Sequence, residues 1–302
     1  MKTVLVTGGS GFIGSHLCRV ASNLDWHLIV LTRDPIGNAS HLPSNAKLID
    51  SLKQLCNYPP VDVVVNLAGQ SLAKGRWNKK RRAQLLDSRV GTTDALYKYF
   101  KSQVGHSPQV VISGSAVGFY GAGNGGDNPI DEDGQSEANF SQYLCAQWER
   151  SARQFEALGS RVCYLRTGIV LGEQGALAKM LPPFKMGLGG PFGNGYQWMP
   201  WVHIDDMVNI IIYSIQEDSL SGAINATAPI PVRNSDFVKV LAAVLKRPAF
   251  FPMPAVLVKV LFGQMGNELL LQGKRVVPKK LQDSGYTFQY TDLKCALTDL
   301  LT

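Results

Sequence analysis

Three glycines near the start of the chain have the spacing of a phosphate-binding turn. Gly8, Gly11 and Gly14 follow the pattern G-x-x-G-x-x-G, between a short apolar run and an apolar segment of helical type. A strand that turns through glycines into a helix points unpaired backbone N–H groups, and the positive end of the helix dipole, at the occupant of the turn. Gly8 allows the tight turn, Gly11 the close approach of a phosphate, and Gly14 the packing of the helix on its strand. This context predicts a dinucleotide site rather than an ordinary glycine-rich turn.

The elements that must position this turn alternate between apolar strands and helices through the first half of the chain. We expect strands at residues 4–6, 27–32, 61–65, 109–112 and 161–165, and helices at 13–24, 79–100 and 141–158. This alternation predicts an α/β fold with a Rossmann-type, doubly wound parallel sheet covered on both faces. Ligands of such sheets bind beyond the carboxyl ends of the strands. The segments expected to meet there are Gly8–Gly14, Thr32–Arg33, Asn66–Gly69 and Ser113–Ser115.

The pattern changes near Gly172, where a long loop rich in proline and glycine begins and shorter helices follow. We therefore expect a dinucleotide-binding domain over residues 1–171. A smaller, mixed substrate lobe should occupy residues 172–302, with some segments, such as 201–217, returning to the first domain.

Composition favours a cytoplasmic enzyme-sized protein. The 302 residues are 45% hydrophobic and 18% charged, which is typical of neither a disordered nor a membrane protein. We expect no membrane partner, because no apolar run reaches the length of a membrane span and no signal segment is evident. The five cysteines are widely spaced without a C-x-x-C pair, which favours reduced thiols, and the five scattered histidines predict no metal site.

The net charge of +7 raises the possibility of nucleic-acid binding. However, the basic residues are spread along the chain, and the densest cluster, Lys79–Arg82, is typical of a solvated helix face. A basic surface also attracts phosphorylated small molecules. We expect a small-molecule substrate and no nucleic-acid partner.

Several motifs together carry a family resemblance. The segment Thr7–Gly14 resembles the opening of the extended short-chain dehydrogenase/reductase family, which includes nucleotide-sugar epimerases. Asn66–Gly69 resembles the strand-four motif of that family, and Trp201–Asp206 its late strand-to-helix motif. The chain is most similar to an atypical branch, the "epimerase family" proteins (NAD-dependent epimerase/dehydratase-like), which have a distinctive C-terminal segment. The marks of this branch are Arg76-Trp77, Ser88-Arg89, Leu144–Glu149, Leu188–Pro191, Gly193, Gly195, Gly273, Pro278, Lys280 and Gly285-Tyr286, so the resemblance covers essentially the whole chain.

The resemblance implies a set of cofactor contacts. In it Leu67 and Ala68 line the adenine or pyrophosphate side, and Val170 lies near the nicotinamide end unless it is plain core. Arg89 could reach a phosphate, with Gln84 a turn earlier, or both are helix-surface residues. The full expected set is Gly8, Gly11, Phe12, Ile13, Gly14, Thr32, Arg33, Leu67, Ala68, Gly69, Gln84, Arg89, Ser113 and Val170.

The residues after the second expected strand bear on which dinucleotide binds. NAD enzymes usually place an acidic residue here for the ribose 2′-OH, whereas this strand ends at Thr32 and Arg33. A hydroxyl and a guanidinium suit a 2′-phosphate, so we expect NADP(H), with NAD less favoured. Asp34 is the rival, as a ribose acid on a longer strand, and Arg33 could also be a solvated loop charge.

The residues for chemistry depart from the family pattern. Short-chain dehydrogenases use a Tyr whose pKa is lowered by a Lys four residues later, and a Ser that orients the substrate oxygen. Ser115 stands in the expected turn with Ser113, but Tyr143 is followed at the cationic position by Gln147, which carries no charge. Tyr143 is therefore favoured as a helix-surface aromatic, and Tyr120 is a second phenol that could donate a proton. The candidate catalytic residues are Ser115, Tyr120 and Tyr143.

Other polar residues have both functional and structural interpretations. An anionic substrate could be held by Lys74, Arg76 and Trp77. A substrate wall, or the packing between the two lobes, could be formed by Trp198, Trp201 and Arg275. Structural roles, including helix capping, explain His203, Asp205 and Asp206.

The sequence thus predicts an NADP-binding epimerase or oxidoreductase acting on a nucleotide sugar or another polar carbonyl or hydroxyl compound by transient hydride transfer. The alternative is a non-catalytic, NADPH-binding regulatory protein. We expect a monomer or a homodimer.

Overall fold

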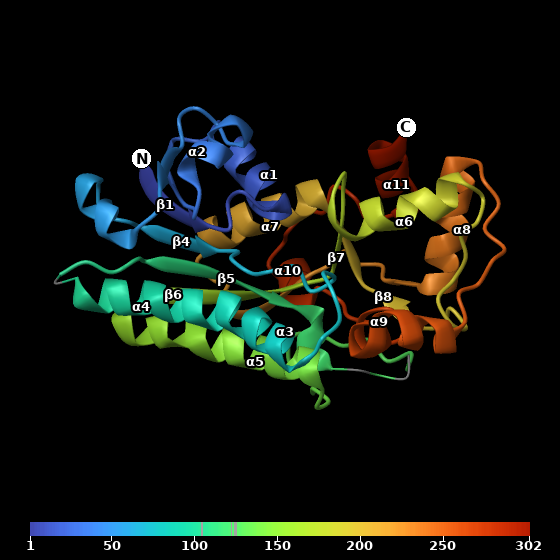
Figure 1. The fold of residues 1–302 in the computed structure, drawn as a ribbon. Coiled ribbons are helices and arrows are strands. Elements are labelled where there is room, and N and C mark those ends of the chain that lie inside the picture. The colour runs from blue at the N-terminus through green and yellow to red at the C-terminus, as the bar shows by residue number, and fades with distance from the viewer. Residues whose placement is uncertain (104, 122, 124–125) are drawn as a thin grey trace.

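The computed structural model describes residues 1–103, 105–121, 123 and 126–302. Its centre is a seven-stranded sheet in the order β10-β6-β5-β4-β1-β2-β3, in which every neighbouring pair is parallel. The strands are β1 (Lys2–Thr7), β2 (Trp26–Leu31), β3 (Lys47–Ile49), β4 (Val63–Asn66), β5 (Val110–Ala116), β6 (Arg161–Thr167) and β10 (Gly222–Ala226). The predicted Rossmann-type α/β fold is confirmed (Figure 1).

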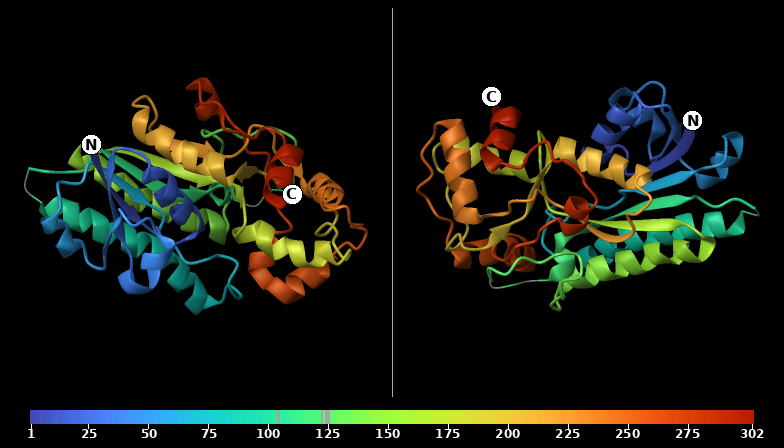
Figure 2. Two further views of the ribbon diagram at one scale, coloured as in Figure 1. Left: turned by 90° about the horizontal axis from the view of Figure 1, so that it is seen from above. Right: turned by 180° about the vertical axis from the view of Figure 1, so that it is seen from behind.

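Helices cover both faces of this sheet because alternate side chains of each strand point to opposite sides. Val4 and Val6 pack with residues of α1 (Phe12–Ala21) and α7 (Ile204–Gln216). Leu5 packs on the other face with residues of α4 (Thr92–Ser102) and α5 (Phe140–Arg153). Figure 2 shows the helices on the two sides of the sheet in two further views. The continuous apolar runs of the sequence therefore fill two separate cores.

Element boundaries differ from the sequence predictions by a few residues. The helix expected at 79–100 is α3 (Lys79–Leu86), a π-helical turn at Asp87–Gly91, and then α4. The helix expected to reach Leu24 ends at Ala21, and the one expected to reach Leu158 ends at Arg153 and continues as a 3-10 turn at Gln154–Leu158. The remaining short elements of this half are α2 (Pro35–Asn38) and 3-10 turns at Ala39–His41, Leu52–Asn57 and Val117–Tyr120.

A smaller lobe lies beside the carboxyl ends of the strands and has its own apolar core, which includes Phe184, Trp201 and Phe237 (Figure 1). Its elements are β7 (Ile169–Leu171), α6 (Gly175–Lys185), β8 (Trp198–Met199), β9 (Trp201–His203), β11 (Val232–Arg233), α8 (Asn234–Leu245), α9 (Ala255–Leu269) and α11 (Leu293–Leu301). The short helix α10 (Lys279–Asp283) packs on the large sheet, where Leu281 joins the core of Val4 and Val6. The chain returns to the large sheet through α7 and β10, and the division at residue 171 stays a prediction. Across the described ranges, the helices are all too short or too polar to cross a membrane.

Candidate dinucleotide and substrate site

The glycine turn (Gly8–Gly14) follows β1 and begins α1. Gly8 has a φ of +71°, and a Cβ there would lie 2.6 Å from the carbonyl oxygen of Leu67, so only glycine fits. A Cβ on Gly14 would lie 2.2 Å from the Gly8 carbonyl oxygen. The contact that requires glycine here is therefore with the turn, whereas the sequence predicted a contact between the helix and its strand. A Cβ on Gly11 would meet only the Gly8 carbonyl oxygen, at 3.2 Å, which leaves the space above the turn open.

The N-terminus of α1 presents backbone donors without a side-chain cap. Gly11 is the N-cap, and its own N–H donates to the Gly8 carbonyl at 3.0 Å. The first turn holds no acidic residue, so the positive end of the helix dipole is not neutralised locally. Phe12 and Ile13 begin the helix, and the Phe12 ring lies against Gly172 while Ile13 packs on the core. The side chains of Phe12 and Ile13 therefore pack elsewhere, and these two residues contribute to the turn through their backbone.

The carboxylate of Asp34 is already engaged. Its Oδ1 accepts from the backbone N–H of Gly37 at 2.8 Å and caps α2. The hydroxyl of Thr32 accepts from the side-chain amide of Asn38 at 3.0 Å, and Arg33 is exposed. This arrangement disfavours Asp34 as a ribose ligand and leaves the Arg33 guanidinium accessible.

The segment after β4 lies against the glycine turn. Asn66 accepts from the Thr7 hydroxyl at 2.6 Å and donates to Thr93 at 2.8 Å, so it ties β1, β4 and α4 together. The backbone of Leu67 and Ala68 passes within contact of Gly8. The structure therefore brings these predicted residues beside the turn.

Arg89 lies beneath the next residues of this segment and is 8% exposed. Its guanidinium donates to the carbonyl oxygens of Gln70, at 3.0 Å, and Leu85, at 3.2 Å, and lies 5.2 Å from the ring of Trp148. A Cβ on Gly69 would lie 3.0 Å from it. Burial lowers the pKa of Arg89 to about 10.

Two other predicted cofactor contacts, Gln84 and Val170, are more exposed to solvent than Arg89. Gln84 is exposed and accepts from Arg81 at 3.4 Å, whereas Val170 is half-buried and packs against the first core. The role of both toward a cofactor stays a prediction.

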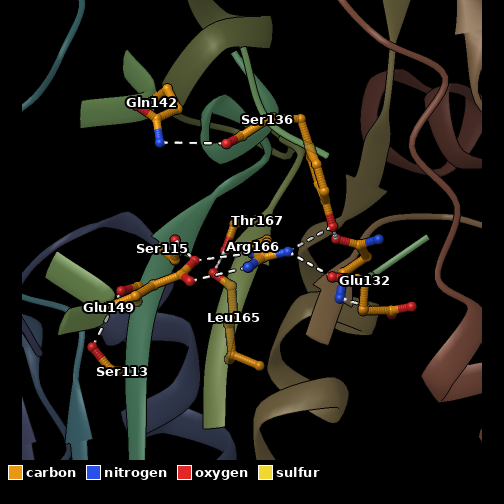
Figure 3. Close-up of polar contacts among 12 residues, drawn as sticks. Ser113, Ser115, Glu132, Ser136, Gln142, Glu149, Leu165, Arg166 and Thr167 are labelled. Carbon is orange, nitrogen blue, oxygen red and sulfur yellow. Dashed lines mark hydrogen bonds and ion pairs between the residues drawn. The ribbon is translucent and has the colours of Figure 1, made fainter. Parts of the chain in front are cut away.

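A buried polar network lies where β5 and β6 end, and Figure 3 shows its centre. Ser115 and Arg166 are register partners on these strands. The Ser115 hydroxyl donates to Oε1 of Glu149, from α5, at 2.7 Å. Arg166 donates to both carboxylate oxygens of Glu149, at 3.0 and 3.1 Å. Ser113, two residues earlier on β5, donates to the Gly114 carbonyl at 3.2 Å.

Tyr120 belongs to the same network and has no exposed surface. Its hydroxyl donates to Asn225 at 2.7 Å and accepts from Arg166 at 3.0 Å. Burial raises the pKa of Tyr120 to about 12. Arg166 also donates to the Glu132 carbonyl at 2.9 Å, and the Glu132 carboxylate accepts from the Asn225 backbone at 3.0 Å. The phenol proton that was expected to be available is thus committed to a buried partner.

Tyr143 lies on α5 and is 49% exposed. Gln147, one turn further along the same helix, is half-buried. The helix therefore carries a phenol at the expected position with a neutral amide in place of the cation.

The other predicted residues mostly hold the two lobes together. Arg76 donates to the carbonyl oxygens of Val260 and Leu261 in α9, and Trp77 is buried and donates to Leu72 at 2.9 Å. Lys74 is exposed. The arrangement ties the loop after β4 to α9.

The predicted tryptophans of the substrate wall differ in exposure. Trp201 is fully buried in the core of the smaller lobe. The half-buried Trp198 lies between two guanidinium groups, with Arg233 at 4.5 Å and Arg275 at 5.2 Å from its ring.

His203 and the two following acids have structural surroundings. His203 is 1% exposed, and its Nδ1 accepts from the backbone N–H of Asp205 at 3.2 Å, so the ring hydrogen is on Nε2. A metal ion at Nε2 would need the opposite tautomer, so this histidine and the nearby Asp205 and Asp299 do not suit one. Asp206 accepts from the backbone of Gln289 and Tyr290 at 2.8 and 2.9 Å.

Sequence reasoning assigned no role to Glu149, Arg166, Glu132 or Asn225. A signal for the first two was present, because each is a charged residue within an otherwise apolar helix face or strand. Buried charges are normally paired, so two such residues on neighbouring elements indicate an ion pair.

Comparison with known proteins defines the class. Residues 4–226 match the model of the NAD dependent epimerase/dehydratase family, and residues 253–300 match a domain of unknown function, DUF1731. The chain belongs to the NAD dependent epimerase/dehydratase family, which confirms the resemblance found in the sequence.

Particular relatives are similar over the full length. Epimerase family protein YfhF of Bacillus subtilis is 35% identical over 99% of this chain and 97% of its own length. Epimerase family protein SSP1921 of Staphylococcus saprophyticus is 38% identical over 100% of both chains. The crystal structure of human epimerase family protein SDR39U1 (isoform 2) with NADPH has a TM-score of 0.86 at 30% identity, covering 99% of this chain and 98% of that one.

Proposed function

We propose that this protein binds NADP(H) in preference to NAD(H), at the glycine turn. The observation that carries the proposal is that the N-terminus of α1 has no side-chain cap and faces open space over Gly11. A Cβ on Gly11 would begin to fill that space. Backbone N–H groups at a helix N-terminus suit a pyrophosphate. The crystallised human relative contains NADPH, which supports the same cofactor here.

The preference for NADP(H) rests on Thr32 and Arg33. Arg33 is exposed just after β2, while the carboxylate of the next residue, Asp34, is engaged in capping α2. A guanidinium forms a charge-assisted, two-pronged contact with a 2′-phosphate, whereas a ribose hydroxyl offers it little.

We further propose that the protein is an epimerase or oxidoreductase for a polar carbonyl or hydroxyl compound, such as a nucleotide sugar. A bound nicotinamide supplies the acceptance and return of a hydride. Ser115 donates its own hydrogen to Glu149, so its oxygen is left to accept a hydrogen bond from a substrate hydroxyl. Arg166 holds the Glu149 carboxylate in place and thereby orients Ser115. The Arg275 guanidinium beside Trp198 suits an anionic substrate portion.

The second candidate function is a regulatory protein that binds NADPH without turnover. Two observations favour it: Gln147 replaces the lysine that would lower the pKa of the Tyr143 phenol, and the Tyr120 hydroxyl is buried. Substrate turnover distinguishes the two functions, because both require the same cofactor site.

Calorimetry with NADPH and NADH on the Arg33→Ala variant tests the cofactor proposal. We expect NADPH binding to weaken by about 1.5–3 kcal/mol, the size of a lost charge-assisted pair, and NADH binding to change little. Arg150→Ala, an exposed arginine on α5, serves as the control and should bind as the native protein does. Equal losses for the two cofactors in Arg33→Ala would refute the assignment.

A screen of carbonyl substrates followed at the NADPH absorbance band then tests catalysis. Consumption of NADPH supports an oxidoreductase. For an epimerase the cofactor is restored in each turnover, so product stereochemistry is measured by NMR. If no compound is converted while NADPH binds tightly, the regulatory function is the better description.

A further inference from the structure

Two segments of the smaller lobe hold most of the net positive charge of this protein. Residues 174–204 and 237–267 contain no Asp or Glu, whereas they hold six Lys or Arg residues. The rest of the chain carries 24 of the 30 Lys and Arg residues against all 23 Asp and Glu residues, so it is nearly neutral. The six cations are all exposed: Lys179, Lys185, Lys239, Lys246, Arg247 and Lys259.

The two acid-free segments run side by side. The backbone N–H of Phe251 donates to the Gly189 carbonyl at 3.1 Å, and that of Met253 donates to the Pro191 carbonyl at 2.9 Å. The connections after α6 and after α8 thus lie together at the outer end of the lobe, far from β1 and β2 (Figure 1).

Exposed apolar side chains gather on the same segments. Phe250 is 81% exposed and Phe251 60%. The first half of α9 adds a stripe at helical spacing, and the neighbouring connection adds two more side chains. The exposed residues of this group are Met186, Leu188, Phe250, Phe251, Val256, Leu257, Val260 and Leu261. Together with Lys185, Lys246, Arg247 and Lys259, they form what we call the basic-apolar face.

A groove beside Phe250 has the same character. Its volume is about 640 Å³, and its lining combines Val238, Ala242 and Pro248 with Lys239, Lys246 and Arg247. The groove shares Lys246, Arg247 and Phe250 with the basic-apolar face, and its Lys239 forms an ion pair with Asp236 at 3.0 Å.

The charges of the face favour an anionic partner over a second copy of this chain. A two-fold contact would place the cations of one copy against those of the other, with no carboxylate in either acid-free segment to pair with them. The apolar side chains then distinguish among anionic partners. A lipid interface accepts protruding Phe, Val and Leu side chains without a shaped pocket, while its headgroups attract Lys and Arg.

We propose that the basic-apolar face binds the surface of membranes that contain anionic phospholipids. Phe250, Phe251 and the apolar stripe of α9 enter the interfacial region, and the surrounding cations contact the headgroups. This is peripheral attachment and does not depend on the proposed cofactor chemistry. The face is also connected to the loop after β4, because Arg76 in that loop donates to the carbonyl oxygens of Val260 and Leu261.

Sedimentation with vesicles tests the proposal. Vesicles of phosphatidylcholine alone are compared with vesicles of phosphatidylcholine and phosphatidylglycerol in equal parts. We expect the native protein to bind the anionic vesicles at least about tenfold more tightly, because four cations lie on the face. The apolar variant is Phe250→Ser with Phe251→Ser, and the charge variant is Lys246→Gln, Arg247→Gln and Lys259→Gln. Each should lose roughly tenfold or more in binding to anionic vesicles.

Matched controls lie on the other lobe. Ile36→Ser removes an apolar side chain that is 91% exposed on α2, and Lys47→Gln, Lys53→Gln and Lys98→Gln together remove three exposed cations. Both controls should bind vesicles as the native protein does, and circular dichroism checks that every variant is folded.

Three results would overturn the proposal. The first is no binding of the native protein to either vesicle. The second is equal binding by the native protein and both face variants. The third is a native dimer, seen by light scattering, that becomes a monomer in the apolar variant while vesicle binding is unchanged, because that would assign the face to a second copy.

Discussion

The glycine turn and the buried polar network lie at the same edge of the sheet, but they treat polar groups in opposite ways. At the turn, the N-terminus of α1 has no side-chain cap and its backbone faces open space over Gly11. In the network, Glu149, Arg166 and Tyr120 are buried and hydrogen-bonded to one another or to neighbouring groups. Polar groups left without a partner are available to a ligand, whereas those satisfied internally hold their surroundings in place.

This difference indicates that the turn and the network contribute to different properties of the protein. The turn is held by close backbone contacts of Gly8 and Gly14, so its donors are fixed before any ligand arrives. The network joins β5, β6 and α5 through Ser115, Arg166 and Glu149. Substitutions in the turn should therefore affect binding first, and substitutions in the network should affect stability first.

The largest effect on cofactor binding is expected for Gly11→Val. The backbone of Gly11, with φ −79° and ψ 174°, is open to any residue, so the variant should fold. Its side chain would occupy the space over the turn, and NADPH affinity should fall at least about a hundredfold, or ~2.7 kcal/mol. Calorimetry measures the affinity, and Ser44→Val on an exposed loop is the control. Native affinity in Gly11→Val would mean that the turn is not the phosphate site.

Arg166→Met tests the network. Removing the guanidinium leaves the Glu149 carboxylate buried without its cation, which should lower the free energy of unfolding by about 3–5 kcal/mol. Urea denaturation measures the loss. Arg150→Met, on the exposed side of α5, should stay within about 0.5 kcal/mol of the native protein. A loss in Arg166→Met no larger than that of the control would show that the network does not stabilise the fold.

Ser115→Ala and Tyr143→Phe compare a network residue with an exposed one. Once a substrate is known, single-turnover hydride transfer should fall roughly a hundredfold in Ser115→Ala, because the group that orients the substrate oxygen is lost. Tyr143→Phe should change the rate by less than about threefold, since Gln147 gives the phenol no charge to assist proton transfer. The reverse order of effects would restore a tyrosine mechanism.

The smallest expected effect is a change in alkaline stability. Burial raises the pKa of Tyr120 to about 12, above the ordinary value of about 10, so the unfolded chain releases this proton at lower pH than the folded protein. The contribution of Tyr120 to stability is therefore complete below pH ~10 and is lost as the pH rises toward ~12. In Tyr120→Phe, the free energy of unfolding should depend less on pH across this window. An unchanged slope in urea melts at several pH values would contradict the assigned burial.

Much of the fold could be predicted from the sequence because its signals are local. The apolar runs before Gly8 and at Val63–Val65 have the length and composition of buried parallel strands, and the alternation with helices specifies a sheet covered on both faces. The glycine turn is local as well, since its three glycines lie within seven residues. Gly8 is required by contact with the segment after β4, and Gly14 by contact with the turn itself.

Predictions were less complete where partners are distant in the sequence. Arg89 was interpreted either as a phosphate ligand or as a helix-surface residue, and the structure buries it beside the carbonyl oxygens of Gln70 and Leu85. Tyr120 was interpreted as a phenol that could donate a proton, and its hydrogen-bond partner Asn225 lies 105 residues away in the sequence, on β10. No local pattern around either residue specifies such neighbours.

The sequence by itself determined the parallel sheet, the open turn and the family, because strand burial, helix periodicity and glycine spacing depend on residues a few positions apart. Only the tertiary structure decided which polar groups are free and which are satisfied. That outcome depends on β5, β6, β10 and α5 meeting in one register, which places Ser115, Glu149, Arg166 and Asn225 within hydrogen-bond range of their partners. A hydrogen bond requires an atom at about 3 Å, and the chain order does not encode that distance.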